Sequence, residues 1–241
     1  KITSEYHILN QIYQPEKILN LLQKIYQKKP METILVPGSE AFLEIGIVEL
    51  ALKYGIPSIG PSKTLACIET SKTFCRNYLR YNHLNDFQPS YEILYDFSES
   101  RLAQIFEKYN FNFVVKADGL CGGKGVRVFD KNSIKDAINY CRELFNQETN
   151  FLNPIKVLIE ERKFGKEFSL LSFCDGENIK HMPIVQDYKD LDKNKIIKTG
   201  GMGSVILPNH SFPFLTEQDI EKCQQLNKKV MELLSRDKSN V

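Results

Sequence analysis

Apolar residues in the first quarter of the chain follow two different periods. Between residues 15 and 26 they recur at helical spacing, and Pro15 suits the first position of a helix. Short apolar runs at 34–36 and 56–59 are typical of buried strands, and a helical pattern at 44–54 lies between them. The order helix, strand, helix, strand predicts the end of an open α/β sheet, which binds ligands beyond the carboxyl ends of its strands.

The pattern changes beyond Pro61, where a helical segment at 64–81 leads into a region with several strands. Further helices are predicted at 133–145 and after Thr216, which suits the N-cap position. Together these elements predict an α+β region at 62–241 that follows a partial α/β domain at 1–61. The predicted strands of this region lie at 111–117, 126–129, 157–161, 167–174 and 179–188.

Composition narrows the function classes. The chain has 241 residues, of which 42% are hydrophobic, and its net charge is +2, so nothing favours nucleic acid or a membrane surface as a partner. No apolar run approaches the roughly 20 residues of a membrane-spanning helix. The six cysteines lie far apart without a C-x-x-C pair, which favours a reducing, cytoplasmic location. The first residue is Lys1, and we expect the chain to be a piece of a longer protein.

The strongest local motif is the glycine-rich loop at 119–125, which lies between two predicted strands. Four glycines and Lys124 leave backbone N–H groups uncovered, and such a loop can wrap a polyphosphate. The spacing differs from that of a Walker A loop, and a strand follows the loop where a dinucleotide fingerprint has a helix. The loop therefore predicts a flap over phosphates, with a surface hairpin that binds no ligand as the alternative.

Charged residues at strand ends support a nucleotide site. Lys116 ends the strand before the loop and can reach an α- or β-phosphate. Glu160 and Glu161 end another apolar strand, and Glu167 follows after a turn. These carboxylates could hold the adenine amino group and the ribose hydroxyls, although each taken singly could equally be a solvated strand-edge charge.

Five stretches in order carry a family resemblance. Residues 55–63, 71–74, 114–120 with 123–126, 159–176, and 186–189 with 199–203 together resemble the phosphoribosylamine–glycine ligase (glycinamide ribonucleotide synthetase) family of ATP-grasp enzymes. The stretches Ser-Lys-Thr-Phe, Lys-Ala-Asp-Gly-Leu and Thr-Gly-Gly-Met-Gly are the most recognisable. The resemblance implies an ATP-grasp domain whose C-terminal part is missing here.

The resemblance also implies roles for individual residues. Lys72 and Lys116 would face the ATP phosphates, and Glu160 would mark the adenine hinge beside Glu161, with Glu167 at the ribose. The flap residues that would close over the β- and γ-phosphates are Gly122, Gly123 and Lys124. The residues that would bind the acceptor substrates are Gly38, Glu40, Asp187, Thr199, Gly200, Gly201, Met202 and Gly203.

The family chemistry implied is ATP-dependent joining of glycine to 5-phosphoribosylamine through a glycyl phosphate. Its cofactors would be ATP and Mg²⁺ or Mn²⁺, with metal ligands expected beyond Val241. Residues 37–40 and 196–198 depart from the family pattern next to the acceptor site. An ATP-grasp ligase with another acceptor, a nucleotide-binding module that lacks its metal site, and a structural domain without a ligand stay open as alternatives, as does the oligomeric state.

Overall fold

The computed structural model describes residues 14–121, 125–146, 156–190, 198–209 and 212–237. The chain divides into two compact units, Lys1–Cys75 and Arg76–Val241. This division falls later than the boundary after residue 61 that the sequence predicts. Because a compact unit is not necessarily a domain, the predicted domains 1–61 and 62–241 stay a prediction.

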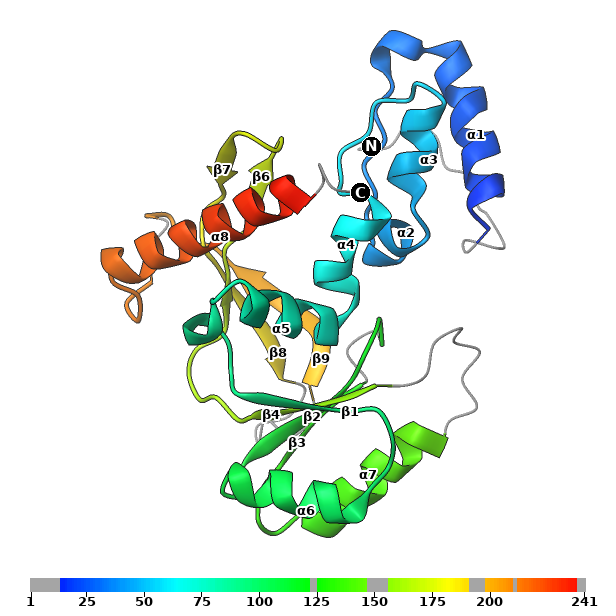
Figure 1. The fold of residues 1–241 in the computed structure, drawn as a ribbon. Coiled ribbons are helices and arrows are strands. Elements are labelled where there is room, and N and C mark those ends of the chain that lie inside the picture. Colours follow the sequence, from blue (N-terminus) through cyan, green and yellow to red (C-terminus); the bar gives the residue numbers. More distant parts are fainter. Residues whose placement is uncertain (1–13, 122–124, 147–155, 191–197, 210–211, 238–241) are drawn as a thin grey trace. The chain divides into compact units, whose positions relative to one another are not determined.

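The N-terminal unit is mainly helical (Figure 1). The predicted first helix is confirmed as α1, which begins at Pro15 and buries Leu19. Within the unit, α1 contacts α3, and α2 contacts α4. The elements are α1 (Pro15–Lys28), the 3₁₀ turn η1 (Pro30–Glu32), α2 (Glu40–Glu44), α3 (Ile47–Lys53), α4 (Lys63–Thr70) and the start of α5 (Lys72–Tyr81).

Two predictions for the N-terminal unit are wrong in detail. The helix predicted at 44–54 begins only at Ile47, as α3, because Gly46 adopts a left-handed conformation with φ 75° and separates it from α2. The runs at 34–36 and 56–59 do lie parallel, but they meet at one bridge, between Leu35 and Ser58. In the described part of the chain, the predicted open sheet is therefore reduced to a single β-bridge.

A four-stranded antiparallel sheet forms the first half of the C-terminal unit, with the order β1-β4-β2-β3. The helices α6 and α7 cover one of the two faces of this sheet (Figure 1). The sequence analysis did not predict β1 or α6, whereas the strands at 113–117, 126–129 and 157–161 are confirmed. The bounds are β1 (Tyr91–Leu94), α6 (Glu99–Lys108), β2 (Phe113–Ala117), β3 (Val126–Phe129), α7 (Ile134–Asn146) and β4 (Val157–Glu161).

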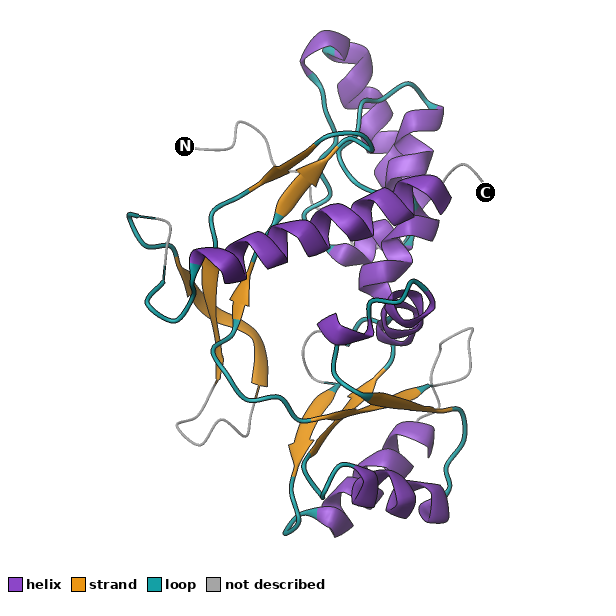
Figure 2. Cartoon of the chain, turned by 60° about the vertical axis from the view of Figure 1, so that its left-hand side comes forward, coloured by secondary structure: helices purple, strands orange, loops and turns teal. Residues whose placement is uncertain are grey.

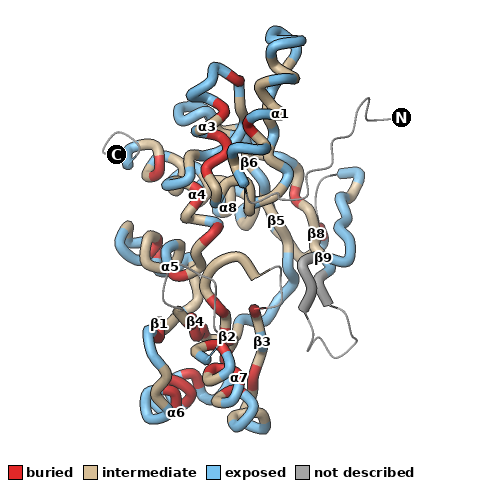
Figure 3. Tube along the Cα trace, turned by 90° about the vertical axis from the view of Figure 1, so that its right-hand side faces the viewer, coloured by how far each residue is buried: buried red, intermediate tan, exposed pale blue. Residues whose placement is uncertain are grey.

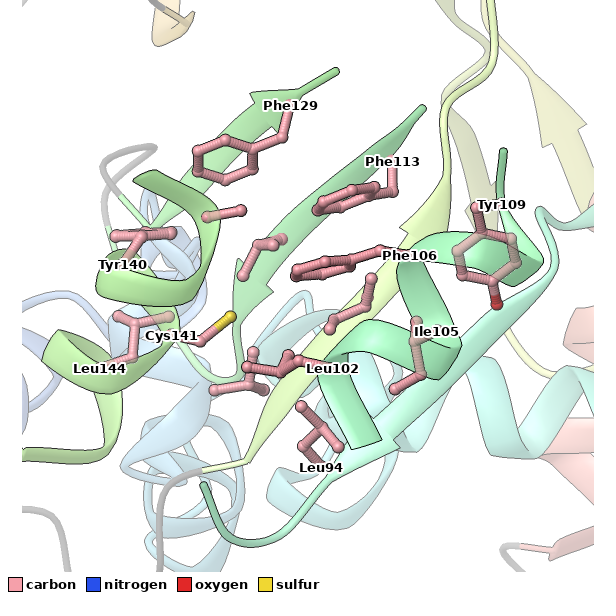
Figure 4. Packing of buried hydrophobic residues seen from close by; sticks show 14 of the residues in the cluster. Leu94, Leu102, Ile105, Phe106, Tyr109, Phe113, Phe129, Tyr140, Cys141 and Leu144 are labelled. Atoms are coloured by element: carbon pink, nitrogen blue, oxygen red, sulfur yellow. The ribbon is translucent and has the colours of Figure 1, made fainter. Parts of the chain in front are cut away.

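Strict alternation along β2 separates the two faces of this sheet. Phe113, Val115 and Ala117 are buried against the helices, whereas Lys116 lies on the opposite face. The ring of Phe113 stacks on that of Phe106 from α6, with centroids 4.1 Å apart (Figure 4). Buried positions gather between the sheet and the two helices (Figure 3). The helix-covered face is therefore the hydrophobic core of this half of the unit. The opposite face carries Lys116 and Glu160 among apolar residues such as Val114 and the buried Leu158.

The second half of the C-terminal unit contains two smaller sheets and a long helix (Figure 2). The strands predicted at 167–174 and 179–188 are each divided into two shorter strands. The bounds are β5 (Phe168–Ser169), β6 (Ser172–Cys174), β7 (Ile179–His181), β8 (Val185–Asp190), β9 (Lys198–Val205) and α8 (Glu217–Asp237), with the 3₁₀ turn η2 (Asn85–Phe87) earlier in the unit. β5, β8 and β9 form one sheet, and β6 pairs with β7.

Side-chain hydrogen bonds attach α8 at its middle and at its C-terminal end. Asn227 Nδ2 donates to the carbonyl of Leu170, at 3.0 Å, and to Ser172 Oγ, at 2.9 Å. The Tyr78 hydroxyl of α5 donates to Asp237 Oδ2 at 2.7 Å. Among the helices that are described, none is both long enough and apolar enough to cross a membrane.

Candidate nucleotide-binding site

Glu160 is the centre of an ion-pair cluster on the face of the four-stranded sheet opposite α6 and α7. It lies on β4 opposite Val114 of β2, and it is only 2% exposed. Its Oε1 accepts from Arg76 Nε of α5 at 2.5 Å, and its Oε2 lies 2.5 Å from Lys116 Nζ of β2. Two cations from different elements therefore converge on one buried carboxylate.

The two cations keep Glu160 ionised. Burial by itself would raise the pKa of this carboxyl group, because a charge loses solvation in the protein interior. The hydrogen bond from Arg76 and the charges of Lys116 and Arg76 outweigh burial, so the pKa lies below its ordinary value. The cluster is thus a fixed set of charges at neutral pH, with the Lys116 ammonium held at a defined position.

The sequence analysis predicted Lys116 and Glu160 separately, and the structure brings them together. It missed Arg76, which is 84 positions from Glu160 in the sequence. A signal was present, because Arg76 lies one helical turn after Lys72 and shares its helix. Spacing along a helix indicates a shared face, but it does not indicate which strand that face meets.

Glu161 has a different environment from that of its neighbour. Its Oε1 accepts from the Ser90 backbone N–H at 2.9 Å and pairs with Lys163 Nζ at 2.5 Å. The hydrogen bond from Lys163 and then the Ser90 N–H lower the pKa of Glu161. This carboxylate therefore joins the end of β4 to the start of β1. Glu167 lies just before β5 and is exposed. Nucleotide-binding roles for Glu161 and Glu167 stay predictions.

The base of the glycine-rich loop is tightly packed. A Cβ on Gly125 would lie 2.7 Å from Cys121 Cβ and 3.2 Å from Ala117 Cβ, so only glycine fits there without displacement. The Ala117 N–H donates to the Gly125 carbonyl at 2.8 Å, which extends the pairing of β2 with β3 into the loop. Gly119 adopts φ 81° in open space. Gly122, Gly123 and Lys124 lie outside the described residues, so their predicted phosphate contacts stay predictions.

The predicted acceptor residues Thr199, Gly200, Gly201, Met202 and Gly203 lie within β9. A Cβ on Gly201 or Gly203 would have nothing within 4 Å, so the backbone is open to close approach there. Gly203 pairs with Tyr188 of β8, and Ser204 pairs with Asp187. Asp187 accepts a hydrogen bond from Ser169 Oγ. Binding of an acceptor substrate at this edge stays a prediction.

Three predicted residues belong to the N-terminal unit. Glu40 is the first residue of α2 and is exposed, and Ser39 caps that helix by accepting from the Ala41 N–H at 3.3 Å. A Cβ on Gly38 would have nothing within 4 Å. Lys72 is the first residue of α5. The ligand contacts expected for Gly38, Glu40 and Lys72 stay predictions.

The carboxylates that are described do not form a metal site. No three side chains of His, Cys, Asp or Glu lie together as metal ligands among the described residues. The strongest candidates already have partners, since Glu160 faces two cations, Glu161 faces Lys163, and Asp187 accepts from Ser169. These groups therefore do not fit a magnesium centre by themselves.

The fold is that of the ATP-grasp class. The chain resembles the biotin carboxylase domain of Hydrogenobacter thermophilus 2-oxoglutarate carboxylase, with a TM-score of 0.68 at 16% identity, over 96% of this chain and 48% of that one. It also resembles phosphoribosylamine–glycine ligase from Thermotoga maritima, with a TM-score of 0.62 at 29% identity, over 88% of this chain and 49% of that one. The biotin carboxylase likeness supports the fold alone.

The family follows from the sequence comparisons. Residues 70–241 match the family model of phosphoribosylglycinamide synthetase, ATP-grasp (A) domain. Phosphoribosylamine–glycine ligase from Methanocorpusculum labreanum is 37% identical over 206 residues, which are 85% of this chain and 45% of that protein. The ligase from Methanocaldococcus jannaschii is 38% identical over 220 residues, which are 89% of this chain and 48% of that protein. The chain belongs to the phosphoribosylglycinamide synthetase family, and it spans about half the length of these curated relatives.

Proposed function

We propose that this chain carries the ATP-binding part of a phosphoribosylamine–glycine ligase, with the nucleotide on the face of the four-stranded sheet that carries Lys116 and Glu160. The observation that carries the proposal is the Lys116 ammonium, which Glu160 holds at 2.5 Å on this face, at the end of the strand that enters the glycine-rich loop. Family membership supports the same assignment.

Lys116 has the properties that a phosphate-binding lysine needs. An ammonium group has three N–H donors, and the Glu160 carboxylate uses one of them, which leaves donors for phosphate oxygens. The side chain is 22% exposed, so a ligand can reach it while much of the surrounding water is excluded. Electrostatic attraction is stronger in such a setting than in bulk water. Lys72 and the loop residues Gly122, Gly123 and Lys124 are proposed to bind the same phosphates.

The proposed reaction joins glycine to 5-phosphoribosylamine. A glycine carboxylate oxygen attacks the γ-phosphorus of ATP, the bond to the β-phosphate oxygen breaks, and ADP leaves. The phosphoribosylamine nitrogen then attacks the carbonyl carbon of the glycyl phosphate, phosphate leaves with the bonding pair, and the nitrogen loses a proton as the amide forms. Such transfer needs positioned positive charge more than a protein nucleophile. The open backbone of β9 at Gly201 and Gly203 is the proposed acceptor side.

The remaining parts of the proposal follow from the family. ATP use with Mg²⁺ or Mn²⁺ is proposed, although the described carboxylates supply no ligand set for the metal. The proposed substrates are glycine, 5-phosphoribosylamine and ATP. The proposed location of the protein is the cytoplasm. No role with nucleic acid is proposed, in line with the net charge of +2.

Calorimetric titration of ATP with Mg²⁺ into the chain and into Lys116→Ala tests the site. We expect at least about tenfold weaker binding by the variant, because it loses a charged phosphate contact. Lys108→Ala is the matched control. Lys108 also pairs with a carboxylate, that of Glu92 at 2.7 Å, but it belongs to α6, outside the proposed site. Equal affinity of Lys116→Ala and the parent chain would refute the proposed site.

The acceptor assignment needs a separate assay. Release of phosphate from ATP is measured with glycine and 5-phosphoribosylamine together, and then with each replaced by another small acid or amine. We expect release only with the cognate pair. Turnover with another pair but not with this one would support a ligase of different acceptor specificity and contradict the proposed substrates.

A further inference from the structure

Two arginines on α5 lie one helical turn apart and have different contacts. Arg76 Nε donates to Glu160 Oε1 at 2.5 Å, and its side chain is only 21% exposed. Arg80 is exposed and lies over the ring of Tyr91, with its guanidinium carbon 5.2 Å from the ring centroid. Arg80 also donates to Asn77 Oδ1 at 3.0 Å. Of the two, Arg76 is the one that contacts the proposed nucleotide site.

The geometry of Glu160 couples Arg76 to Lys116. Each carboxylate oxygen has one cation, Oε1 with Arg76 and Oε2 with Lys116. A guanidinium is planar and holds its donors in a fixed arrangement, whereas an ammonium is a point charge on a long, mobile stem. Arg76 therefore fixes the orientation of the carboxylate, and the carboxylate in turn fixes the ammonium of Lys116.

We propose that Arg76 is a positioning residue for the nucleotide: it acts through Glu160 to hold the Lys116 ammonium in place, and it keeps this arrangement intact at mildly acidic pH. The inference rests on the proposed function, because Lys116 is the group proposed to bind phosphate. Neither the family resemblance nor the comparisons assign a role to Arg76.

The pH dependence follows from the surroundings of Glu160. The charged or titratable groups that face it in the described structure are Arg76 from α5, Lys116 from β2 and, across the strand pair, Tyr91 from β1, which Arg80 covers. Without Arg76, a carboxylate that is 2% exposed keeps Lys116 as its one contacting cation among the described residues. Burial then favours the protonated form, and a neutral Glu160 holds the ammonium more weakly.

Nucleotide affinity in three variants tests the inference: Arg76→Gln, Arg76→Lys and the matched control Arg80→Gln. The dissociation constant for ATP with Mg²⁺ is measured near pH 8 and near pH 5.5, and each variant is compared with the parent chain at the same pH, so that titration of the nucleotide itself cancels. For Arg76→Gln we expect binding about threefold weaker at the higher pH and about tenfold weaker again at the lower pH. Arg76→Lys keeps the charge but loses the planar guanidinium, so we expect it to bind about threefold more weakly at both pH values. Arg80→Gln is expected to stay within about twofold of the parent at both values.

An equal loss for Arg76→Gln at both pH values would overturn the inference, because a merely structural contact has no reason to depend on the ionisation of Glu160. Parent-like binding by Arg76→Gln at both values would overturn it as well. Either result leaves the proposed nucleotide site standing as long as Lys116→Ala binds weakly.

A second measurement tests Arg76 without any nucleotide. The carboxyl carbon of Glu160 and the ammonium of Lys116 are followed by NMR during an acid titration, with the Glu160 signal assigned from its loss in Glu160→Gln. In Arg76→Gln we expect the midpoint of Glu160 to rise by at least about two pH units, which a further tenfold loss of binding near pH 5.5 requires, and the Lys116 signal to change at the same midpoint. An unchanged midpoint would overturn the inference. If the parent chain binds no ATP, the proposed function fails, while this titration still decides whether Arg76 positions Lys116.

Discussion

Replacement of Glu160 by Gln tests how much the buried ion-pair cluster contributes to stability. Glu160→Gln keeps the size of the side chain but removes the charge that Arg76 and Lys116 share. Each charge-assisted hydrogen bond to a carboxylate contributes about 1.5–3 kcal/mol, and the desolvation of a carboxylate that is 2% exposed offsets part of the sum. Because both cations are only about one-fifth exposed, solvent screening is weak. We expect the free energy of unfolding to fall by about 2–4 kcal/mol at neutral pH.

Glu92 provides a matched control, because it also has two cations as partners. Its oxygens lie 3.0 Å from Arg101 Nη2 and 2.7 Å from Lys108 Nζ. These partners are 53% and 50% exposed, so the pairs are screened by water and salt. Glu92→Gln is therefore expected to cost only about 0.5–1 kcal/mol. Urea titration followed by circular dichroism, at low and at high salt, measures both variants. Equal losses for the two variants, or a loss for Glu160→Gln that disappears in salt, would refute the reasoning.

The same comparison has a defined pH dependence. The pKa of Glu160 is lowered in the folded protein from its ordinary value of 4.5. The stabilisation from its charge is therefore fully present above the pKa of the unfolded chain, and it is lost as the pH falls through the lower, folded value. The difference in stability between the parent and Glu160→Gln is expected to be constant from neutral pH to about 5.5 and to shrink below about 4.5. A difference that grows on acidification would contradict this sign.

Two further substitutions probe the loop and the core. Gly125→Ala is expected to lower the free energy of unfolding by about 1–3 kcal/mol and to weaken ATP binding, because the new methyl group would overlap Cys121. Gly119→Ala has space for the methyl group and is expected to lose only about 1 kcal/mol, from the left-handed conformation. Urea titration checks both, and equal costs would show that packing at the loop base is unimportant. Phe106→Ala removes a ring that is 1% exposed and stacked on Phe113, and a loss of about 3–5 kcal/mol is expected by the same method. A loss below about 1 kcal/mol would place the core elsewhere.

The elements that the sequence predicted well are those whose apolar period is unbroken. The runs at 113–117 and 157–161 are buried strands that contain four and three apolar residues, and both were found with nearly correct ends. The strand β1 was missed, whereas β3, which has the same length, a charged second residue and an edge position, was predicted because it directly follows the glycine-rich loop. The helix α6 did carry a signal, with Ser98 as its N-cap and Leu102, Ile105 and Phe106 at helical spacing.

The candidate site was predictable only in part, because its key contacts are between segments that are distant in the sequence. Lys116 could be found from its place at the end of a strand that enters a glycine-rich loop. Its partners could not, since the contact of Arg76 with Glu160 depends on how α5 packs on the sheet. Gly46 shows the reverse case, where a local conformation with φ 75° interrupts a helical pattern that continues on both sides.

The alternation along β2 links correct folding to function. Its odd-numbered positions fill the core, and Lys116 lies among the even-numbered ones. A shift of one residue in the pairing of β2 would turn Lys116 toward the rings of Phe106 and its neighbours and would expose Phe113 to water. A molecule misfolded in this way would be inactive and unstable at once. Cellular proteases would then remove it, so that defective copies would not accumulate as folded competitors for substrate.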